Sequence, residues 1–122
     1  MKPLLNIATV PRDGAVHVVA EGELDLSTAP RLDAALVAAE ATDAPMIVVD
    51  IDAVSFIDSS GLRMLLAANT RSQRDGNRLR LTRGTDEVRR LFALVDVGNR
   101  LPFIDRPASP GPRSAAGSRP DA

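Results

Sequence analysis

The 122-residue chain contains no cysteine, no tryptophan and no tyrosine, and only three phenylalanines. Without cysteine it has no disulfide framework, no thiol nucleophile and no thiolate metal ligand. The scarcity of aromatic side chains argues against stacking on nucleic-acid bases, so we expect no nucleic-acid partner. A folded core must instead be built from Leu, Val, Ile, Ala and Met.

The chain also lacks a long apolar segment. Its first residues show no apolar stretch followed by a small-residue cleavage site, and no run approaches the roughly 18 apolar residues of a membrane-spanning helix. Neither a metal-ligand spacing nor a Gly-rich phosphate loop is present, so we expect no metal and no bound cofactor. Together these absences predict a cytoplasmic protein without a membrane partner.

Charge is small in total but unevenly divided: the net charge is −1, with three basic and ten acidic side chains in residues 1–58 and twelve and six in residues 59–122. Such asymmetry can indicate an electrostatically polarised partner surface. Because no nucleic-acid reading motif accompanies the arginines, we interpret them as solvated helix and strand faces. They are Arg71, Arg74, Arg78, Arg80, Arg83, Arg89 and Arg90.

The first half of the chain has the pattern of a β-hairpin followed by a helix. Two β-branched runs, 4–10 and 15–20, flank the turn sequence Pro11-Arg12-Asp13-Gly14. Ser27 or Thr28 offers an N-cap hydroxyl ahead of apolar residues at helical spacing, which predicts a helix over 28–41.

The second half alternates strands with helices. A continuous apolar run at 46–51 is typical of a central strand covered on both faces. Helical spacing follows from Asp58 to about Arg74, and 79–82 alternates as a strand does. A third helix begins after Thr85 or Asp86 and continues to Val95, with Gly98 just past its end.

The resulting order is ββαβαβα, which predicts an α/β fold with a mixed, partly parallel sheet backed by helices. We expect one domain over residues 1–106. Residues 107–122 are rich in Pro, Ser, Ala and Gly and contain no large apolar side chain. Ordering that segment would cost backbone entropy with nothing to offset it, so we predict a disordered tail.

The segment Asp58-Ser59-Ser60-Gly61 opens the second helix, and its plainest interpretation is a helix N-cap. The site also suits phosphate, because a helix start presents backbone N–H donors and the positive end of the helix dipole. Gly61 would let a partner's backbone approach closely. A phosphate beside Asp58 would change the local potential strongly.

This sequence resembles the STAS family, the domain shared by bacterial anti-sigma factor antagonists and the cytoplasmic tails of sulfate transporters. The matching elements are Gly22-Glu23-Leu24-Asp25 after the second strand, Val49-Asp50, Phe56-Ile57-Asp58-Ser59-Ser60-Gly61-Leu62, and Val88-Arg89-Arg90-Leu91-Phe92 in the third helix. They span most of residues 4–104, in the family's order and spacing.

The resemblance implies an anti-sigma factor antagonist. Ser59 would be phosphorylated by a partner that is both anti-sigma factor and Ser/Thr kinase, and a Ser/Thr phosphatase would reverse this. The unphosphorylated protein would sequester the kinase and free a sigma factor. Asp25 and Asp58 match acidic positions flanking the family's site, and Ser60 matches the adjacent hydroxyl. The family resemblance also suggests a monomer or weak dimer.

Two expectations concern neighbouring positions. Arg63 stands where many family members have a small residue, so it could narrow partner choice or pair with a phosphate on Ser59. A solvated arginine is the plainer interpretation. We take the partner-binding set to be Asp25, Asp58, Ser60, Gly61, Leu62 and Arg63.

Two other functions compete with the switch. The chain could be a STAS scaffold or ligand-sensing domain in which Ser59 is only a cap. It could also be a serine hydrolase, but the only histidine, His17, lies between two valines in a predicted strand and no Gly-x-Ser-x-Gly elbow is present. We therefore expect no enzymatic activity.

Overall fold

The computed structural model describes residues 4–95 and 100–104. Its four-stranded sheet has the order β1-β2-β3-β4, with β1 and β2 antiparallel and β3 parallel to both β2 and β4. The expected mixed sheet and the order ββαβαβα are confirmed. The domain boundary at 106, the tail at 107–122 and Gly98 lie outside the described residues. The strands are β1 Leu5–Arg12, β2 Ala15–Leu24, β3 Met46–Ile57 and β4 Leu79–Leu81.

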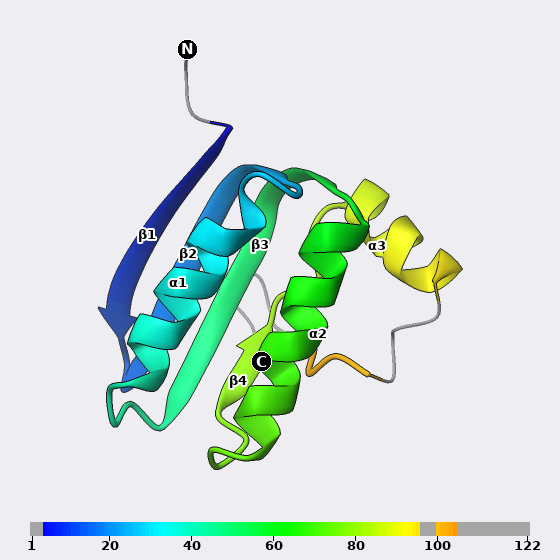
Figure 1. Ribbon diagram of the computed structural model, residues 1–122. Coiled ribbons are helices and arrows are strands. Elements are labelled where there is room, and N and C mark those ends of the chain that lie inside the picture. Colours follow the sequence, from blue (N-terminus) through cyan, green and yellow to red (C-terminus); the bar gives the residue numbers. More distant parts are fainter. Residues whose placement is uncertain (1–3, 96–99, 105–122) are drawn as a thin grey trace, which may run out of the picture.

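Three helices complete the fold: α1 Ala29–Glu40, α2 Ser59–Gln73 and α3 Asp86–Leu94. Figure 1 shows α1 and α2 side by side over one face of the sheet, with α3 to the right of the upper part of α2. The core lies between these helices and the sheet and consists almost wholly of aliphatic side chains. Its fully buried members include Val18, Leu24, Leu32, Leu36, Val49, Ile51, Val54 and Leu65.

Both central strands are longer than the apolar runs that predicted them. Gly22 to Leu24 belong to β2 instead of following it, and β3 continues through Asp52 and Ser55 to Ile57. These added segments pair with each other in parallel register, with two register shifts. Backbone pairing therefore extends the ladder past polar positions, which hydrophobic patterning alone does not reveal.

The hairpin turn is also tighter than expected. Pro11 and Arg12 pair with Val16 and Ala15 inside the ladder, so only Asp13 and Gly14 form the turn. Both have positive φ, 53° and 80°. Two central residues with positive φ are typical of the tight turns that match the twist of antiparallel strands.

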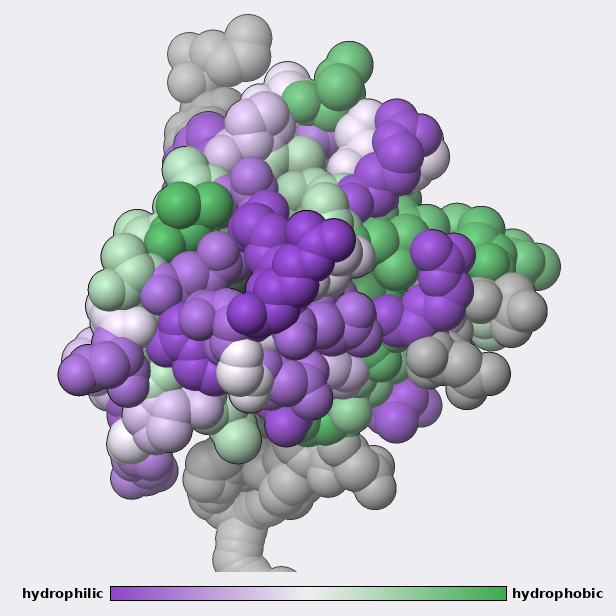
Figure 2. Space-filling view, turned by 60° about the horizontal axis from the view of Figure 1, so that its bottom comes forward, coloured by the Kyte–Doolittle hydropathy of each residue, from purple (hydrophilic) through white to green (hydrophobic). Residues whose placement is uncertain are grey.

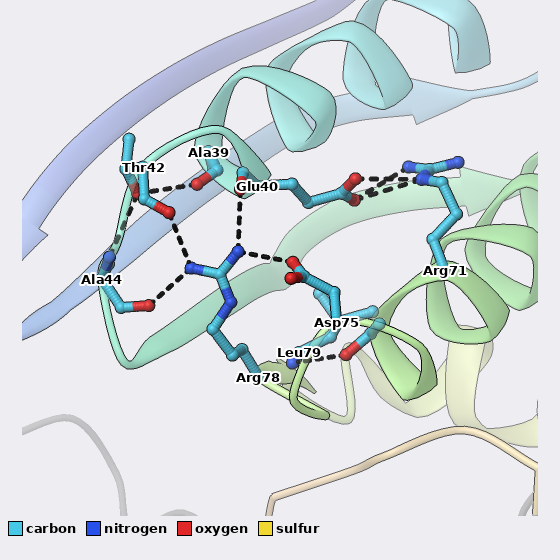
Figure 3. A network of polar contacts seen from close by, with 9 residues as sticks. Ala39, Glu40, Thr42, Ala44, Arg71, Asp75, Arg78 and Leu79 are labelled. Carbon is cyan, nitrogen blue, oxygen red and sulfur yellow. Dashed lines mark hydrogen bonds and ion pairs between the residues drawn. The ribbon is translucent and has the colours of Figure 1, made fainter.

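Two arginines, Arg71 and Arg78, form a network of polar contacts at the C-terminal end of α1 (Figure 3). Arg78 donates hydrogen bonds to the backbone carbonyls of Glu40, Thr42 and Ala44 at 2.8, 2.9 and 2.7 Å (Figure 3). These carbonyls lie at and just beyond the end of α1, where helical carbonyls have no intrahelical partner. Arg78, which comes from a different part of the chain, therefore supplies hydrogen-bond donors to the backbone carbonyls at the C-terminus of α1.

Arg71 joins α2 to α1 in the same region. Its guanidinium contacts the carboxylates of Glu40 and Asp33 at 3.0 and 2.9 Å, and the hydrogen bond to Glu40 raises the pKa of Arg71. Figure 2 shows hydrophilic surface gathered over this end. The interpretation as solvated faces holds in part for Arg71, whose side chain is 36% exposed beside two acids. It is wrong for Arg78, whose side chain is 14% exposed and donates to three backbone carbonyls.

Candidate functional site

Asp25 and Asp58 lie together at the carboxyl ends of two adjacent parallel strands. The last residues of β2 and β3, Leu24 and Ile57, are partners in the ladder, and the Asp58 N–H donates to the Leu24 carbonyl at 3.1 Å. The carboxyl edge of a parallel sheet is where such folds commonly place binding residues. Two positions 33 residues apart in sequence are thus brought to one surface.

Asp58 is the N-cap of α2. Its backbone is extended, and its Oδ1 accepts hydrogen bonds from the N–H groups of Ser60 and Gly61 at 2.9 and 3.1 Å. Its carbonyl accepts the N–H of Leu62 at 3.0 Å. The predicted cap is present, but these donors are already occupied. The expectation that a phosphate would find backbone donors at this helix start is therefore wrong for the N–H groups of Ser60 and Gly61.

Ser59 is the first residue of α2 and is exposed, whereas Ser60 is half-buried. Leu62 is partly buried and packs against the core, so it offers only part of its side chain to a partner. Arg63 is exposed. Of the two adjacent hydroxyls, Ser59 is thus the more accessible to a modifying enzyme.

Gly61 is buried inside the protein. A Cβ at this position would lie 2.8 Å from Cγ of Leu24 and 2.9 Å from Cγ1 of Ile57. The space left by its missing side chain is filled by this chain's own β2 and β3, so no partner's backbone approaches there. Gly61 instead lets the first turn of α2 rest directly on the sheet, which fixes the position of Ser59.

Asp25 organises the loop between β2 and α1. Its Oδ1 accepts hydrogen bonds from the hydroxyl and N–H of Ser27, at 2.7 and 3.0 Å, and from the N–H of Thr28 at 3.1 Å. These bonds, that of the Ser27 hydroxyl first, lower the pKa of Asp25. The carboxylate therefore holds its own loop and does not extend freely toward a partner.

The predicted hydroxyl cap of α1 is wrong. Thr28 is the N-cap residue, but its side chain makes no capping bond. Its hydroxyl donates to the Glu23 carbonyl at 2.8 Å and accepts the Asp25 N–H at 2.9 Å. The hydroxyl thus fastens the loop to β2, because the sharp turn after Leu24 brings strand carbonyls within its reach.

Leu26 is the surface residue that sequence reasoning missed. It is 74% exposed, at the tip of the loop that Asp25 holds. Single exposed leucines are common, but this one lies in a turn that Asp25 orders, two residues past the end of β2. The available signal was an apolar residue between two polar loop residues, Asp25 and Ser27.

The histidine of β2 lies at the opposite end of that strand from this site. His17 pairs with Val48 and lies seven positions before Leu24 in β2, which is roughly 23 Å of extended strand. That distance prevents it from acting as a base for Ser59. No cluster of three potential metal-ligating side chains occurs within residues 4–95 and 100–104. No helix in that same part of the chain is long and apolar enough to cross a membrane.

Comparison with known proteins identifies the fold and the family. A family model described as Mlab, STAS domain, matches residues 7–104. An anti-sigma-B factor antagonist of Staphylococcus aureus is 30% identical over 93 residues, which cover 76% of this chain and 86% of that protein.

Solved structures give the same result. An anti-sigma factor antagonist from Mycobacterium paratuberculosis superposes with a TM-score of 0.74 at 27% identity, over 84% of this chain and 86% of that one. The anti-sigma factor antagonist SpoIIAA in its unphosphorylated form gives 0.64 at 23% identity, over 84% and 89%, which shows a shared fold. The chain therefore belongs to the STAS domain family, and its relatives include that family's anti-sigma factor antagonists.

Proposed function

We propose that this protein is an anti-sigma factor antagonist whose binding is switched by phosphorylation of Ser59. The observation that carries the proposal is the placement of an exposed Ser59 directly after the capping Asp58, on a helix start fixed by Gly61. The family match supports the assignment. The partners are an anti-sigma factor Ser/Thr kinase and a Ser/Thr phosphatase. We place this cycle in the cytoplasm and expect the protein to be a monomer or weak dimer.

The switch acts on a binding surface and leaves the fold intact. Ser59 is exposed, so a phosphate there would add about −1.5 to −2 charges to the surface without displacing buried groups. The unphosphorylated surface combines the exposed Leu26 with the carboxylate of Asp58. Added negative charge beside Asp58 would repel a partner that fits the uncharged serine.

The test is incubation with the anti-sigma factor kinases of the source organism and ATP, followed by mass-spectrometric site mapping. We expect a single phosphate on Ser59. Ser59→Ala should bind the kinase in the presence of ATP without being released, whereas Ser59→Glu should bind at least tenfold more weakly. Ser60→Ala removes the adjacent hydroxyl and should still receive its single phosphate on Ser59, which separates the two serines as acceptors whatever the effect on binding.

Phosphate on Ser60 alone, or no phosphorylation by any of these kinases, would contradict the proposal. If Ser59→Ala and the original protein then bound the same nucleotide or other small molecule equally tightly, the chain would be a STAS ligand-sensing or scaffold domain.

A further inference from the structure

A phosphate on Ser59 would find several of the nearby backbone donors of α2 already in use. Three N–H groups in the first turn of α2, those of Ser60, Gly61 and Leu62, donate to the carboxylate or carbonyl of Asp58. The Asp58 carboxylate also places a negative charge one residue away. The Asp58 carboxylate thus uses part of the positive helix end that would ordinarily stabilise a phosphate, and a nearby cation would offset the added negative charge.

Arg63 is placed to supply that cation. It lies four residues after Ser59, so both side chains project from the same face of α2, one turn apart. Helical side chains lean toward the N-terminus of their helix, which directs Arg63 toward Ser59 and away from the far end of α2. Both residues are exposed, so nothing buried has to move for them to meet.

Arg63 also has no competing anion on its own helix. The sequence of α2, SSGLRMLLAANTRSQ, contains no acidic residue. Within residues 4–95 and 100–104, ion pairs engage Arg71, Arg78 and Arg89, and none engages Arg63. A guanidinium can donate two parallel hydrogen bonds to a phosphate, which makes arginine the better of the two basic residue types for this contact.

We propose that Arg63 binds the phosphoryl group of phosphorylated Ser59 and stabilises the phosphorylated state. This inference rests on the proposed function, because it assumes that Ser59 is the modified residue. It assigns to Arg63 a role in the phosphorylated state, in which it offsets the repulsion between the phosphate and Asp58. The ligand is the protein's own phosphate.

The test needs no partner protein. The full chain is produced with phosphoserine installed at position 59 during synthesis, and phosphorus NMR follows the second ionisation of the phosphate, ordinarily near pH 6. We expect Arg63→Gln to raise that pKa by roughly half a unit, the size of an exposed ion pair. In Arg63→Lys the phosphate pKa should lie between those of the original protein and Arg63→Gln, because lysine keeps the charge but lacks the paired donors of a guanidinium.

Arg74→Gln is the matched control. This exposed arginine lies at the C-terminal end of α2, 15 residues and about 22 Å of helix from Ser59, well beyond the screening length of about 10 Å at 0.1 M salt. It should leave the phosphate pKa unchanged. The effect of Arg63→Gln should shrink in 0.5 M salt, and the unphosphorylated variant should unfold at the same urea concentration as the original protein.

Equal phosphate pKa values in Arg63→Gln, Arg74→Gln and the original sequence would overturn the inference. That result is independent of whether any kinase modifies Ser59. If the kinase experiment fails and Arg63→Gln still shifts the phosphate pKa, the proposed function is wrong and the contact is real. A shift of the same size in Arg74→Gln would show a general charge effect and would also overturn the inference.

Discussion

At one end of the molecule a negative side chain accepts hydrogen bonds from the start of a helix, and at the other end a positive side chain donates hydrogen bonds to the end of a helix. At the carboxyl ends of β2 and β3, Asp58 satisfies backbone N–H groups at the start of α2. At the other end, Arg78 satisfies backbone carbonyls at the end of α1. Both arrangements place a side-chain charge where it complements the helix dipole.

The two ends differ in what remains for a partner. Arg78 is only 14% exposed at its side chain and donates to three carbonyls and to Asp75, so its charge is used within the protein. Beside Asp58, by contrast, Ser59 and Leu26 stay exposed on an ordered backbone. The polar groups around Arg78 therefore stabilise the fold, whereas the end at Asp58 combines a stabilising helix cap with exposed side chains that a partner could contact.

Breaking the arginine network should have the largest effect. Arg78→Met removes all of these hydrogen bonds while keeping an apolar stem, and we expect the free energy of unfolding to fall by about 2 kcal/mol. Urea unfolding followed by circular dichroism measures this change. Arg74→Met replaces an exposed arginine nearby and should cost less than about 0.5 kcal/mol. Equal losses in the two variants would remove the distinction between the two ends.

Removing the carboxylate cap should have an intermediate effect. Asp58→Ala leaves the N–H groups of Ser60 and Gly61 without their acceptor and should cost about 1 kcal/mol of unfolding free energy. Asp58→Asn retains a capping oxygen and should recover most of this loss. If both variants were equally destabilised in urea, the charge of Asp58, and not its hydrogen bonds, would be the stabilising feature.

The smallest expected effect is a pH dependence from Asp25. Its pKa is held below the ordinary value of 3.8, chiefly by the Ser27 hydroxyl. Its contribution to stability is therefore fully present above about pH 4 and is lost as the pH falls through the lowered pKa. Asp25→Asn should be less stable than the original protein at pH 6, with the difference shrinking toward pH 2.5.

Urea midpoints at the two pH values measure this change. Ser27→Ala removes the largest cause and should show part of the same loss. A difference between Asp25→Asn and the original protein that grew on acidification would contradict the sign of the shift.

Local patterns predicted the element order and the cap at Asp58, because those features depend on neighbours in sequence. Pairings between distant residues escaped prediction. The roles of Arg78 and Arg71 depend on carbonyls and carboxylates of α1, more than 30 residues away. The sequence suggested that Gly61 makes room for a partner's backbone. The structure shows instead that a side chain at this position would collide with Leu24, the last residue of β2. Hydrophobic pattern also could not place the end of β3, since that stretch is held by its pairing with β2.

The close packing of Gly61 against the ends of β2 and β3 would also affect how the proposed phosphorylation switch works. Ser59 stands on a helix turn that packs closely on the buried side chains of Leu24 and Ile57. Phosphorylation at this point would therefore change the surface charge without a conformational change, and a partner would recognise the added charge directly. If Ser59 is modified as proposed, the rates of the modifying enzymes, and not a conformational change of this protein, would set the speed of the switch.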